Sequence, residues 1–276
     1  MKLNNEIISS RANARVRWAA SLSDKKSRAE ERSFIAEGEK LTLEALEAHL
    51  PVTHIFIAES RFEREWSLLS DYADSSEYEN VAVIRLEDTV FEKISTEKAP
   101  QGIISVIKYL DFFNTFDIIY KEDFFSSADE RTLALFSVRD PGNLGAVIRS
   151  AVAFGVDHIV LSSDCADVYN HKTVRAAMGS LFRTRISTVR DFGEFISVAR
   201  ESGRRVFAAE LTEGARSLRE LDTRASDIFI IGNEGHGIPR EISSLTDGSV
   251  YIPISRKTES LNASVAAAVF MWEISK

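Results

Sequence analysis

The segment Pro141-Gly142-Asn143-Leu144-Gly145, which continues to Arg149, is the first of three loop segments that decide the fold. The other two are Gly232-Asn233-Glu234-Gly235-His236-Gly237 and Ile252-Pro253-Ile254 through Ser260-Leu261-Asn262. Each segment follows a strand-like run. In open α/β folds the loops after parallel strands meet at the carboxyl edge of the sheet, where ligands bind. The three segments therefore predict a nucleotide-like pocket with one nearby arginine.

Strand and helix patterns alternate from Thr132 to the end of the chain. We expect strands at 133–138, 158–161, 184–189, 205–209, 228–231 and 250–254. Helical patterns lie between them, at 144–154, near Val174, at 192–201 and from 261 to about 273. This alternation of short apolar strands and helices predicts an α/β fold with a mostly parallel sheet that is covered on both faces.

The first 108 residues predict a second, smaller α/β sandwich. Strand-like runs at 33–36, 53–58, 81–84 and 102–108 alternate with helical patterns at 11–22, 38–50 and 61–72. Residues 109–130 fit no clean period and end in Ser126-Ser127-Ala128-Asp129, which is typical of a connection between domains. We therefore expect domains at 1–108 and 131–276, joined by a linker at 109–130.

The composition is that of an ordinary globular protein. Of 276 residues, 44% are hydrophobic and 28% are charged, and the net charge is −8. The single Cys165 cannot form an internal disulfide, and the first 25 residues lack the apolar core of a signal peptide, so we expect a cytoplasmic location. No run reaches the roughly 18 apolar residues that a membrane span needs, so no membrane partner is expected.

Basic residues gather in two stretches despite the acidic total. Residues 1–28 hold seven Lys or Arg against two acids, and residues 171–190 hold five and no Asp or Glu. Two such stretches suit a protein that grips a polyanion at two places, although solvated surface faces give the same pattern. Candidate phosphate contacts are Arg11, Arg15, Arg17, Lys25, Lys26 and Arg28 in the first stretch and Arg175 in the second.

The first loop segment has the features of a helix start. Asn143 is a good N-cap, and Gly155 ends the helix. The apolar stripe consists of Leu144, Val147, Ile148 and Ala151. Arg149 lies off that stripe, above the small residues Gly145 and Ala153, so a substrate backbone can approach it closely. Taken alone, the segment also fits a capped helix with a surface arginine.

The second segment has three glycines in six residues, between a strand and a helix that starts near Pro239. Such a loop frees backbone N–H and C=O groups for a ligand, although many glycine-rich loops are only tight turns. It contains neither the Gly-Lys-Ser/Thr of a nucleoside-triphosphate loop nor the Gly-x-Gly-x-x-Gly of a dinucleotide-binding fold. A dehydrogenase is therefore disfavoured.

In the third segment Ser260 is placed to cap an alanine-rich helix. We expect one apolar side of this helix to consist of Leu261, Val265, Val269 and Trp272. Its alanines permit close backbone packing, which suits either a core helix or a helix that pairs with a symmetry mate.

Metal-dependent and hydrolytic chemistry are disfavoured. The five histidines do not form a ligand-spaced set, so no metal site is expected. The sequence lacks a Gly-x-Ser-x-Gly elbow. Asp164 and Asp167 should raise the pKa of the neighbouring Cys165 thiol, which makes that thiol a poor nucleophile.

Together, the three segments closely resemble the SpoU/TrmH branch of the SPOUT RNA 2′-O-ribose methyltransferases, in order and in spacing. The resemblance is strong over residues 131–276, including Arg175 to Ser180. Ile8-Ser9-Ser10, Asn13 and Phe34 to Gly38 resemble the family's RNA substrate-binding domain, which looks like a ribosomal-protein-type RNA binder. The resemblance implies a deep trefoil knot in the C-terminal domain, a rare feature among folds. It also implies a homodimer, with S-adenosyl-L-methionine as methyl donor.

The resemblance also assigns site residues. Gly232, Ile252 and Leu261 are expected to line the S-adenosylmethionine pocket. The positions that match the family's active site are Asn143, Arg149, Glu234, Ser260 and Asn262. Arg256 departs from the family, in which glycine is common in the loop before Ser260.

The expected reaction is methyl transfer to a ribose 2′-hydroxyl of structured RNA, with ribosomal RNA as first choice and transfer RNA as alternative. A catalytically inactive RNA-binding protein is a second alternative, but it should have lost Asn143, Arg149 or Asn262. A guanidinium, whose pKa lies above about 12, is a poor proton acceptor. Arg149 is therefore expected to orient an RNA phosphate and to stabilise the developing alkoxide.

Overall fold

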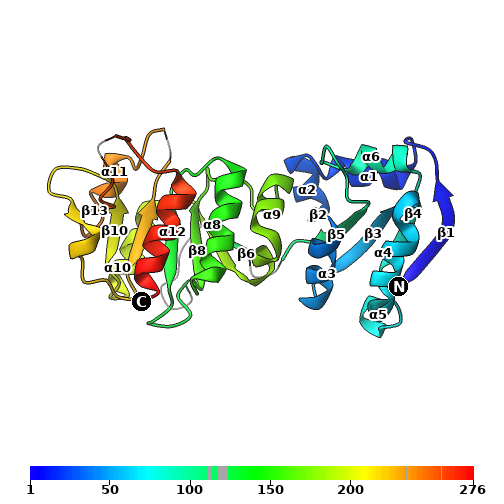
Figure 1. Cartoon of the computed structure of the whole chain (residues 1–276). Coiled ribbons are helices and arrows are strands. Elements are labelled where there is room, and N and C mark those ends of the chain that lie inside the picture. Colours follow the sequence, from blue (N-terminus) through cyan, green and yellow to red (C-terminus); the bar gives the residue numbers. More distant parts are fainter. Residues whose placement is uncertain (111–112, 117–123, 234, 256) are drawn as a thin grey trace. The chain divides into compact units, whose positions relative to one another are not determined.

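The computed structural model of the chain describes all residues except 111–112, 117–123, 234 and 256. Two compact units make up the described chain (Figure 1). The first comprises Met1–Leu110 and Tyr169–Phe182, and the second comprises Asp111–Val168 and Arg183–Lys276. Among the described residues, none of the helices combines the length and apolar character that crossing a bilayer demands.

The first unit contains a five-stranded sheet in the order β1-β4-β3-β5-β2. Its strands are β1 (Lys2–Ile8), β2 (Ser33–Glu37), β3 (Val52–Ala58), β4 (Ala82–Leu86) and β5 (Ile103–Lys108). β1, β4 and β3 are parallel, whereas β5 runs antiparallel to both β3 and β2. Its helices are α1 (Ala14–Ser21), α2 (Lys25–Glu31), α3 (Glu39–Glu47), α4 (Phe62–Leu68), α5 (Ser70–Ala73), α6 (Asp88–Ile94) and α9 (His171–Ala177).

One core of this unit joins α1 and α6 to the sheet. Val16 and Phe91 from the helices pack with Phe56 and Ile84 from the strands. α9 packs against β2, and its Val174 is buried. Residues 169–182 therefore belong to the first unit, whereas the sequence placed them in the domain at 131–276.

Three elements of the first unit were missed by the sequence patterns. β1 is an edge strand that buries only Ile8, so it shows no alternation of apolar and polar residues. α2 is a short polar helix in which Arg28 is the buried residue. α6 has seven residues, which is too short for a clear helical period.

The second unit contains an eight-stranded sheet in the order β11-β13-β10-β12-β7-β8-β9-β6. Its strands are β6 (Phe113–Phe116), β7 (Thr132–Leu135), β8 (His158–Ser162), β9 (Arg185–Val189), β10 (Val206–Ala209), β11 (Arg216–Ser217), β12 (Ile228–Ile231) and β13 (Ser249–Tyr251). The pairings between these strands are all parallel, which confirms the predicted parallel sheet. Its helices are α8 (Pro141–Ala153), α10 (Phe192–Glu201), α11 (Arg240–Ser243) and α12 (Ala263–Ile274).

Successive side chains of β12 point to opposite faces of the sheet, where they contact different helices. Ile228 and Ile230 pack in one core with Phe195 of α10. Phe229 points to the other face, where its ring lies 4.6 Å from that of Phe270 on α12. α12 packs against α8 on that face (Figure 1). The sheet is therefore covered on both faces, as the sequence predicted.

The predicted linker at 109–130 contributes to the second unit. Its residues 113–116 form β6, which pairs with β9, and Phe124 is fully buried. The pattern was missed because a four-residue edge strand is too short to show a period. Residues 111–112 and 117–123 of the predicted linker lie outside the described part of the chain.

Candidate active site

The three loop segments meet at the carboxyl edge of the eight-stranded sheet, as predicted. They follow β7, β12 and β13, and two hydrogen bonds join them. The Asn233 Nδ2 donates to the Ser137 carbonyl at 2.8 Å, which ties the second loop to the residues just before the first segment. The Asn262 Nδ2 donates to the Asn143 Oδ1 at 3.0 Å, which ties the third segment to the first.

A cavity of about 270 Å³ lies between the ends of β10, β12 and β13 and the start of α12. Its wall includes all three predicted cofactor-binding residues, Gly232, Ile252 and Leu261, together with Ser260. Apolar side chains such as Ile231 and Phe270 form other parts of the wall. The cavity is therefore mostly apolar, with main-chain groups at the strand ends.

The second loop is held closed by Asn233. Its Oδ1 accepts hydrogen bonds from the backbone N–H of Gly235 at 2.8 Å and of His236 at 3.2 Å. Backbone bonds between Asn233 and Gly237 complete the turn. A Cβ on Gly232 would lie 2.6 Å from the Gly237 carbonyl carbon, so this close approach requires glycine. Sequence analysis did not identify Asn233, although asparagine in a glycine-rich loop is the usual signal for such a side-chain turn.

The start of α8 differs from the prediction. Asp140, not Asn143, is the N-cap, and its Oδ1 accepts from the Asn143 N–H at 2.7 Å. Asp140 is favoured because Pro141 follows it at the first helical position, where the missing N–H costs nothing. The rest of the prediction is confirmed: Leu144 and the other stripe residues are buried, and Gly155, at φ 65°, follows the helix end.

The start of α12 also differs. Asn262, not Ser260, is the N-cap, and its Oδ1 accepts from the Ser264 N–H at 2.9 Å and from the Ser264 hydroxyl at 2.6 Å. Ser260 is exposed, and its carbonyl accepts from the Thr258 hydroxyl. Asn262 therefore caps α12 with its oxygen while its nitrogen holds Asn143.

Ser137 is a further residue that the sequence did not reveal. Its φ of 57° lies in the left-handed region, which is uncommon for a residue other than glycine. Its N–H donates to the Ser162 hydroxyl at 2.8 Å and its carbonyl accepts from Asn233. These bonds hold a strained backbone position beside the cavity loops, a setting in which strain is common.

Two arginines near the first segment have different surroundings. Arg139 donates to the Asp164 carboxylate at 2.8 Å. Burial alone would raise the pKa of Asp164, but hydrogen bonds from Ser162, Arg139 and Ser137 outweigh it and lower that pKa to about 2. Arg149 is exposed on α8, off the buried stripe, and within the described part of the chain it has no hydrogen-bond or ion-pair partner. It does not belong to the cavity wall.

The remaining predictions in the second unit concern Glu234, Arg256, metals and Cys165. Glu234 and Arg256 lie outside the described residues. Across the residues that are described, no cluster of His, Cys, Asp and Glu suited to a metal ion is found. The pKa of Cys165 is raised, as predicted, but burial is the largest cause and Asp164 contributes less.

Three of the exposed predicted phosphate contacts in the first unit, Arg15, Arg17 and Lys25, have no side-chain hydrogen bond or ion pair with the described residues. Arg15 also lines a polar groove of about 500 Å³ together with Asn4 and Asn13. The positive charge of Arg15 contributes to the lowered pKa of His54, although burial of that imidazole is the larger cause. This groove, which Glu6 also lines, is a candidate surface for a polar ligand in the first unit.

The other predicted contacts are engaged within the protein. Arg28 is only 2% exposed and donates to the carbonyls of Leu22 and Ser23, so the structure corrects its role from phosphate contact to support of the α1–α2 turn. Arg11 donates to the Thr89 carbonyl at 2.7 and 2.9 Å. Exposed ion pairs join Lys26 to Glu30 and Arg175 to Glu97.

Comparison with known proteins gives consistent matches. The SpoU rRNA Methylase family matches residues 130–272, and the MRM3-like substrate binding domain matches residues 13–105. The chain is 30% identical over 267 residues to the 23S rRNA (guanosine(2553)-2′-O)-methyltransferase RlmP of Bacillus subtilis, covering 97% of this chain and 98% of the relative. It is 27% identical to the 23S rRNA (uridine(2479)-2′-O)-methyltransferase of Streptomyces viridochromogenes, covering 93% and 87% respectively.

A solved structure, the AdoMet-bound rRNA methyltransferase from Sinorhizobium meliloti, matches with a TM-score of 0.80 and 28% identity. The match covers 98% of this chain and 97% of that one. Family matches over both halves, a relative of 30% identity over nearly the full length and the shared fold all agree, so the chain belongs to the SpoU rRNA methylase family.

Proposed function

We propose that this protein transfers the methyl group of S-adenosyl-L-methionine to a ribose 2′-hydroxyl of ribosomal RNA. The observation that carries the proposal is one arrangement in the second unit: the Asn143–Asn262 hydrogen bond joins the first loop segment to the third, and the second and third segments line the cavity. The named curated relatives are 23S rRNA 2′-O-methyltransferases, which supports ribosomal RNA over transfer RNA as the substrate.

The residues of the cavity suit S-adenosylmethionine. Apolar walls such as Ile231 and Phe270 fit an adenine ring, and the strand ends offer main-chain groups to its polar edge. The tight packing of Gly232 on Gly237 keeps the second loop compact beside this space. When bound, S-adenosylmethionine supplies an electrophilic methyl group on a sulfonium.

The chain's own residues then have to position the ribose and stabilise charge. Asn143 and Asn262 fix two side-chain amides at the start of α8 and α12, which gives a rigid edge for the substrate. Arg149, which has no partner within the described chain, is available to orient an RNA phosphate. Its positive charge would also stabilise the alkoxide that forms as the 2′-hydroxyl loses its proton.

The first unit is proposed to bind the RNA. Its match to a substrate-binding domain and the exposed Arg15, Arg17 and Lys25 support this role. An electrostatic contribution of this kind makes affinity depend on salt.

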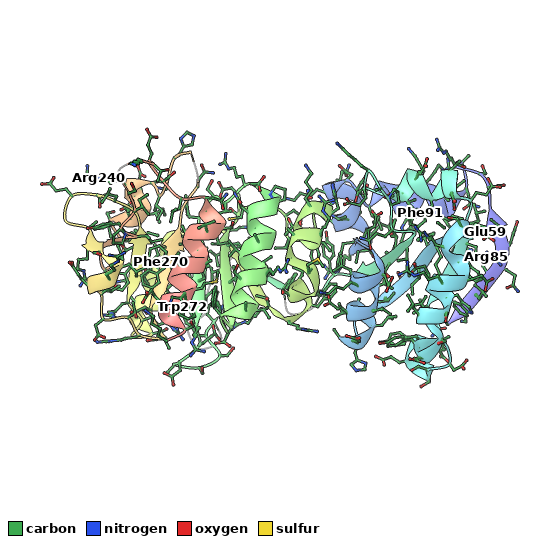
Figure 2. The ribbon with its side chains drawn as sticks, in the orientation of Figure 1. Glu59, Arg85, Phe91, Arg240, Phe270 and Trp272 are labelled. Atoms are coloured by element: carbon green, nitrogen blue, oxygen red, sulfur yellow. The ribbon has the colours of Figure 1, made fainter. Side chains whose placement is uncertain are left out.

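The second unit is proposed to form a homodimer through α12. Val265 and Trp272 are 49% and 55% exposed, and the Trp272 ring lies 5.9 Å from that of Phe154. Figure 2 marks Trp272 on α12, along with the buried Phe270. Exposed apolar groups on one helix support a protein interface. The trefoil knot and the cytoplasmic location stay predictions.

Methyl transfer from radiolabelled S-adenosylmethionine to ribosomal RNA tests the proposed function. The RNA should come from a strain that lacks the gene, so that its target nucleotide is unmodified, with transfer RNA from the same strain as the comparison. We expect label in ribosomal RNA at one 2′-O position, mapped by resistance to alkaline cleavage. Label in transfer RNA alone would contradict the choice of substrate, and label in neither would contradict the activity.

A further inference from the structure

Glu210 places a fixed carboxylate in the cavity wall. It follows β10 directly, and its backbone N–H donates to the Val250 carbonyl at 3.1 Å. Its Oε1 accepts from the Ser249 hydroxyl at 2.7 Å. The side chain is half-buried and lines the cavity. A carboxylate held in this way does not need to be reoriented when a ligand enters.

The charge of the cavity wall is negative. Of the described residues that line it, Glu210 and Glu259 are acidic, and none is Lys, Arg or His. The surrounding side chains, such as Val250 and Phe270, are apolar, which lowers the local dielectric constant and weakens the screening of charge. A cationic ligand is therefore favoured over a neutral ligand of the same shape.

The proposed reaction changes the charge of its cofactor. Transfer of CH₃⁺ from the sulfonium to the ribose oxygen leaves a neutral thioether, and the proton of the 2′-hydroxyl is released. S-adenosylmethionine thus carries one positive charge more than S-adenosylhomocysteine, while the two share the adenine, the ribose, the carboxylate and the ammonium. A wall carboxylate would therefore act on the difference between donor and product if the sulfur bound beside it.

We propose that Glu210 is a specificity residue that makes the cavity prefer the methyl donor to the demethylated product, and thereby promotes exchange of product for donor. This inference rests on the proposed function. Coulomb attraction between unit charges about 4 Å apart corresponds to about fivefold in affinity even at the dielectric constant of water. At such a separation Glu210 would contribute about fivefold to the preference.

Isothermal titration calorimetry on the full-length protein tests this role. S-adenosylmethionine and S-adenosylhomocysteine are titrated into wild type, Glu210→Gln and the matched control Glu213→Gln. Glu213 is exposed in the same loop and is not part of the cavity wall. Thermal unfolding and circular dichroism establish that each variant is folded.

We expect Glu210→Gln to weaken S-adenosylmethionine about fivefold or more while changing S-adenosylhomocysteine by less than about twofold. Glu213→Gln should leave both affinities unchanged. Sinefungin, in which a carbon that bears an ammonium group replaces the sulfonium, should follow S-adenosylmethionine.

Two results overturn the inference. Equal weakening of donor and product by Glu210→Gln means that Glu210 binds a group shared by both, such as the ribose hydroxyls. No change in either affinity means that the charge of Glu210 does not affect ligand binding. Failure of the proposed cofactor is distinct, because wild type would then bind none of these ligands, and failure of the proposed substrate shows in the RNA-labelling assay.

Discussion

Arg149 and Arg139 show why an arginine's partners matter more than its position in a motif. Arg139 is held by Asp164 and supports the loop after β7. Arg149 projects from α8 and is exposed, with no such partner among the described residues. The Arg149 guanidinium is not used to hold a loop in the described chain, so Arg149 is available to a ligand.

We predict that Arg149→Ala abolishes methyl transfer while leaving S-adenosylmethionine affinity nearly intact. Loss of a preorganised cation at a developing oxyanion costs on the order of 100-fold to 1000-fold in rate. Arg149→Lys should restore little, because a point charge cannot reproduce the planar guanidinium fork. The measurement is single-turnover transfer to RNA at saturating cofactor, with the exposed Arg219→Ala as control. A rate within about threefold of wild type, under roughly 1 kcal/mol of barrier, would remove Arg149 from the mechanism.

The asparagines at the site show which features of the site can be predicted from residue types and which cannot. The sequence predicted that Asn143 and Asn262 belong to one site, and the structure joins their side chains. It could not decide the helix caps, because Asp140, Asn143, Ser260 and Asn262 are all favourable N-cap types. Only the backbone conformation selects among them. Asn233 and Ser137 were missed because their roles depend on contacts with distant loops.

Gly232 shows that a residue predicted to contact the ligand can also be required by the fold. It was predicted as a cofactor contact, and it does line the cavity. Its lack of a side chain is also required by the loop, since any Cβ would collide with the Gly237 backbone. Substitution at Gly232 would therefore disturb the loop as well as the cavity, and Glu210 gives a cleaner test of cofactor binding.

Among the elements, α12 was predicted in extent but not in orientation. The apolar side expected at Leu261, Val265, Val269 and Trp272 is not the buried one, because Val265 and Trp272 are exposed. The buried residues are Ala263, Ala267, Phe270, Met271 and Ile274. A helix that is apolar on nearly every side carries no periodicity by which to choose a face.

The amino ends of β7, β8 and β9 carry a buried ionic cluster that lies away from the cavity loops. The Glu130 side chain is 3% exposed and accepts from the His158 Nδ1 at 3.0 Å and from Arg185 at 2.9 Å. Burial alone would raise the pKa of Glu130, but hydrogen bonds from His158 and Ser126 outweigh it and lower that pKa to about 2. Burial lowers the pKa of His158, so this imidazole is held neutral.

We predict that this cluster makes the second unit acid-sensitive. A carboxyl whose pKa falls from 4.5 to about 2 on folding stabilises the fold above about pH 4.5, and this contribution is lost as the pH falls towards 2. Folding also lowers the pKa of His158, so protonation of this imidazole likewise destabilises the fold at low pH. This loss of stability begins as the pH falls below 6.5. Urea unfolding from pH 7 to pH 3 should show Glu130→Gln less stable by about 3 kcal/mol at pH 7, because Arg185 loses its buried partner.

The difference between wild type and Glu130→Gln should shrink as the pH falls, since wild type then loses the same interaction by protonation. Glu220→Gln, at an exposed carboxylate in the same unit, serves as control and should follow wild type. A difference that stays constant between pH 7 and pH 3 would show that Glu130 acts through packing and not through its charge.

For the whole molecule, the two-unit organisation was predictable from sequence but its boundaries were not. The change of pattern near residue 110 matches the division after Leu110. The assignment of residues 169–182 to the first unit depends on the packing of α9 against β2, which no local pattern reveals. Removing residues 1–109 would uncover Val174 and its neighbours, so point substitutions test RNA binding better than truncation.

We predict that the double variant Arg15→Ala/Arg17→Ala binds ribosomal RNA more weakly and with a smaller salt dependence. Each lost phosphate contact should reduce the slope of log affinity against log salt by about 0.7 to 0.9. Filter binding across a salt series measures that slope. Arg11→Ala is the comparison, because Arg11 already donates to the Thr89 carbonyl. An unchanged slope in the double variant would exclude these two arginines from the RNA interface.

We also predict that the protein is a homodimer and that Trp272→Asp makes it monomeric. A Trp that is 55% exposed on a monomer, beside Phe154 and on the same helix as the exposed Val265, has the properties of an interface anchor. Burying such an anchor typically contributes about 2 kcal/mol or more, so its replacement by a charge should weaken association by about 30-fold or more. Light scattering coupled to gel filtration should give twice the chain mass for wild type and a single chain mass for Trp272→Asp. Leu245→Asp, at a 40% exposed position elsewhere in the second unit, should remain dimeric. A Trp272→Asp protein that stays dimeric over a 100-fold dilution would place the interface on another face, and a monomeric wild type would require each chain to act alone.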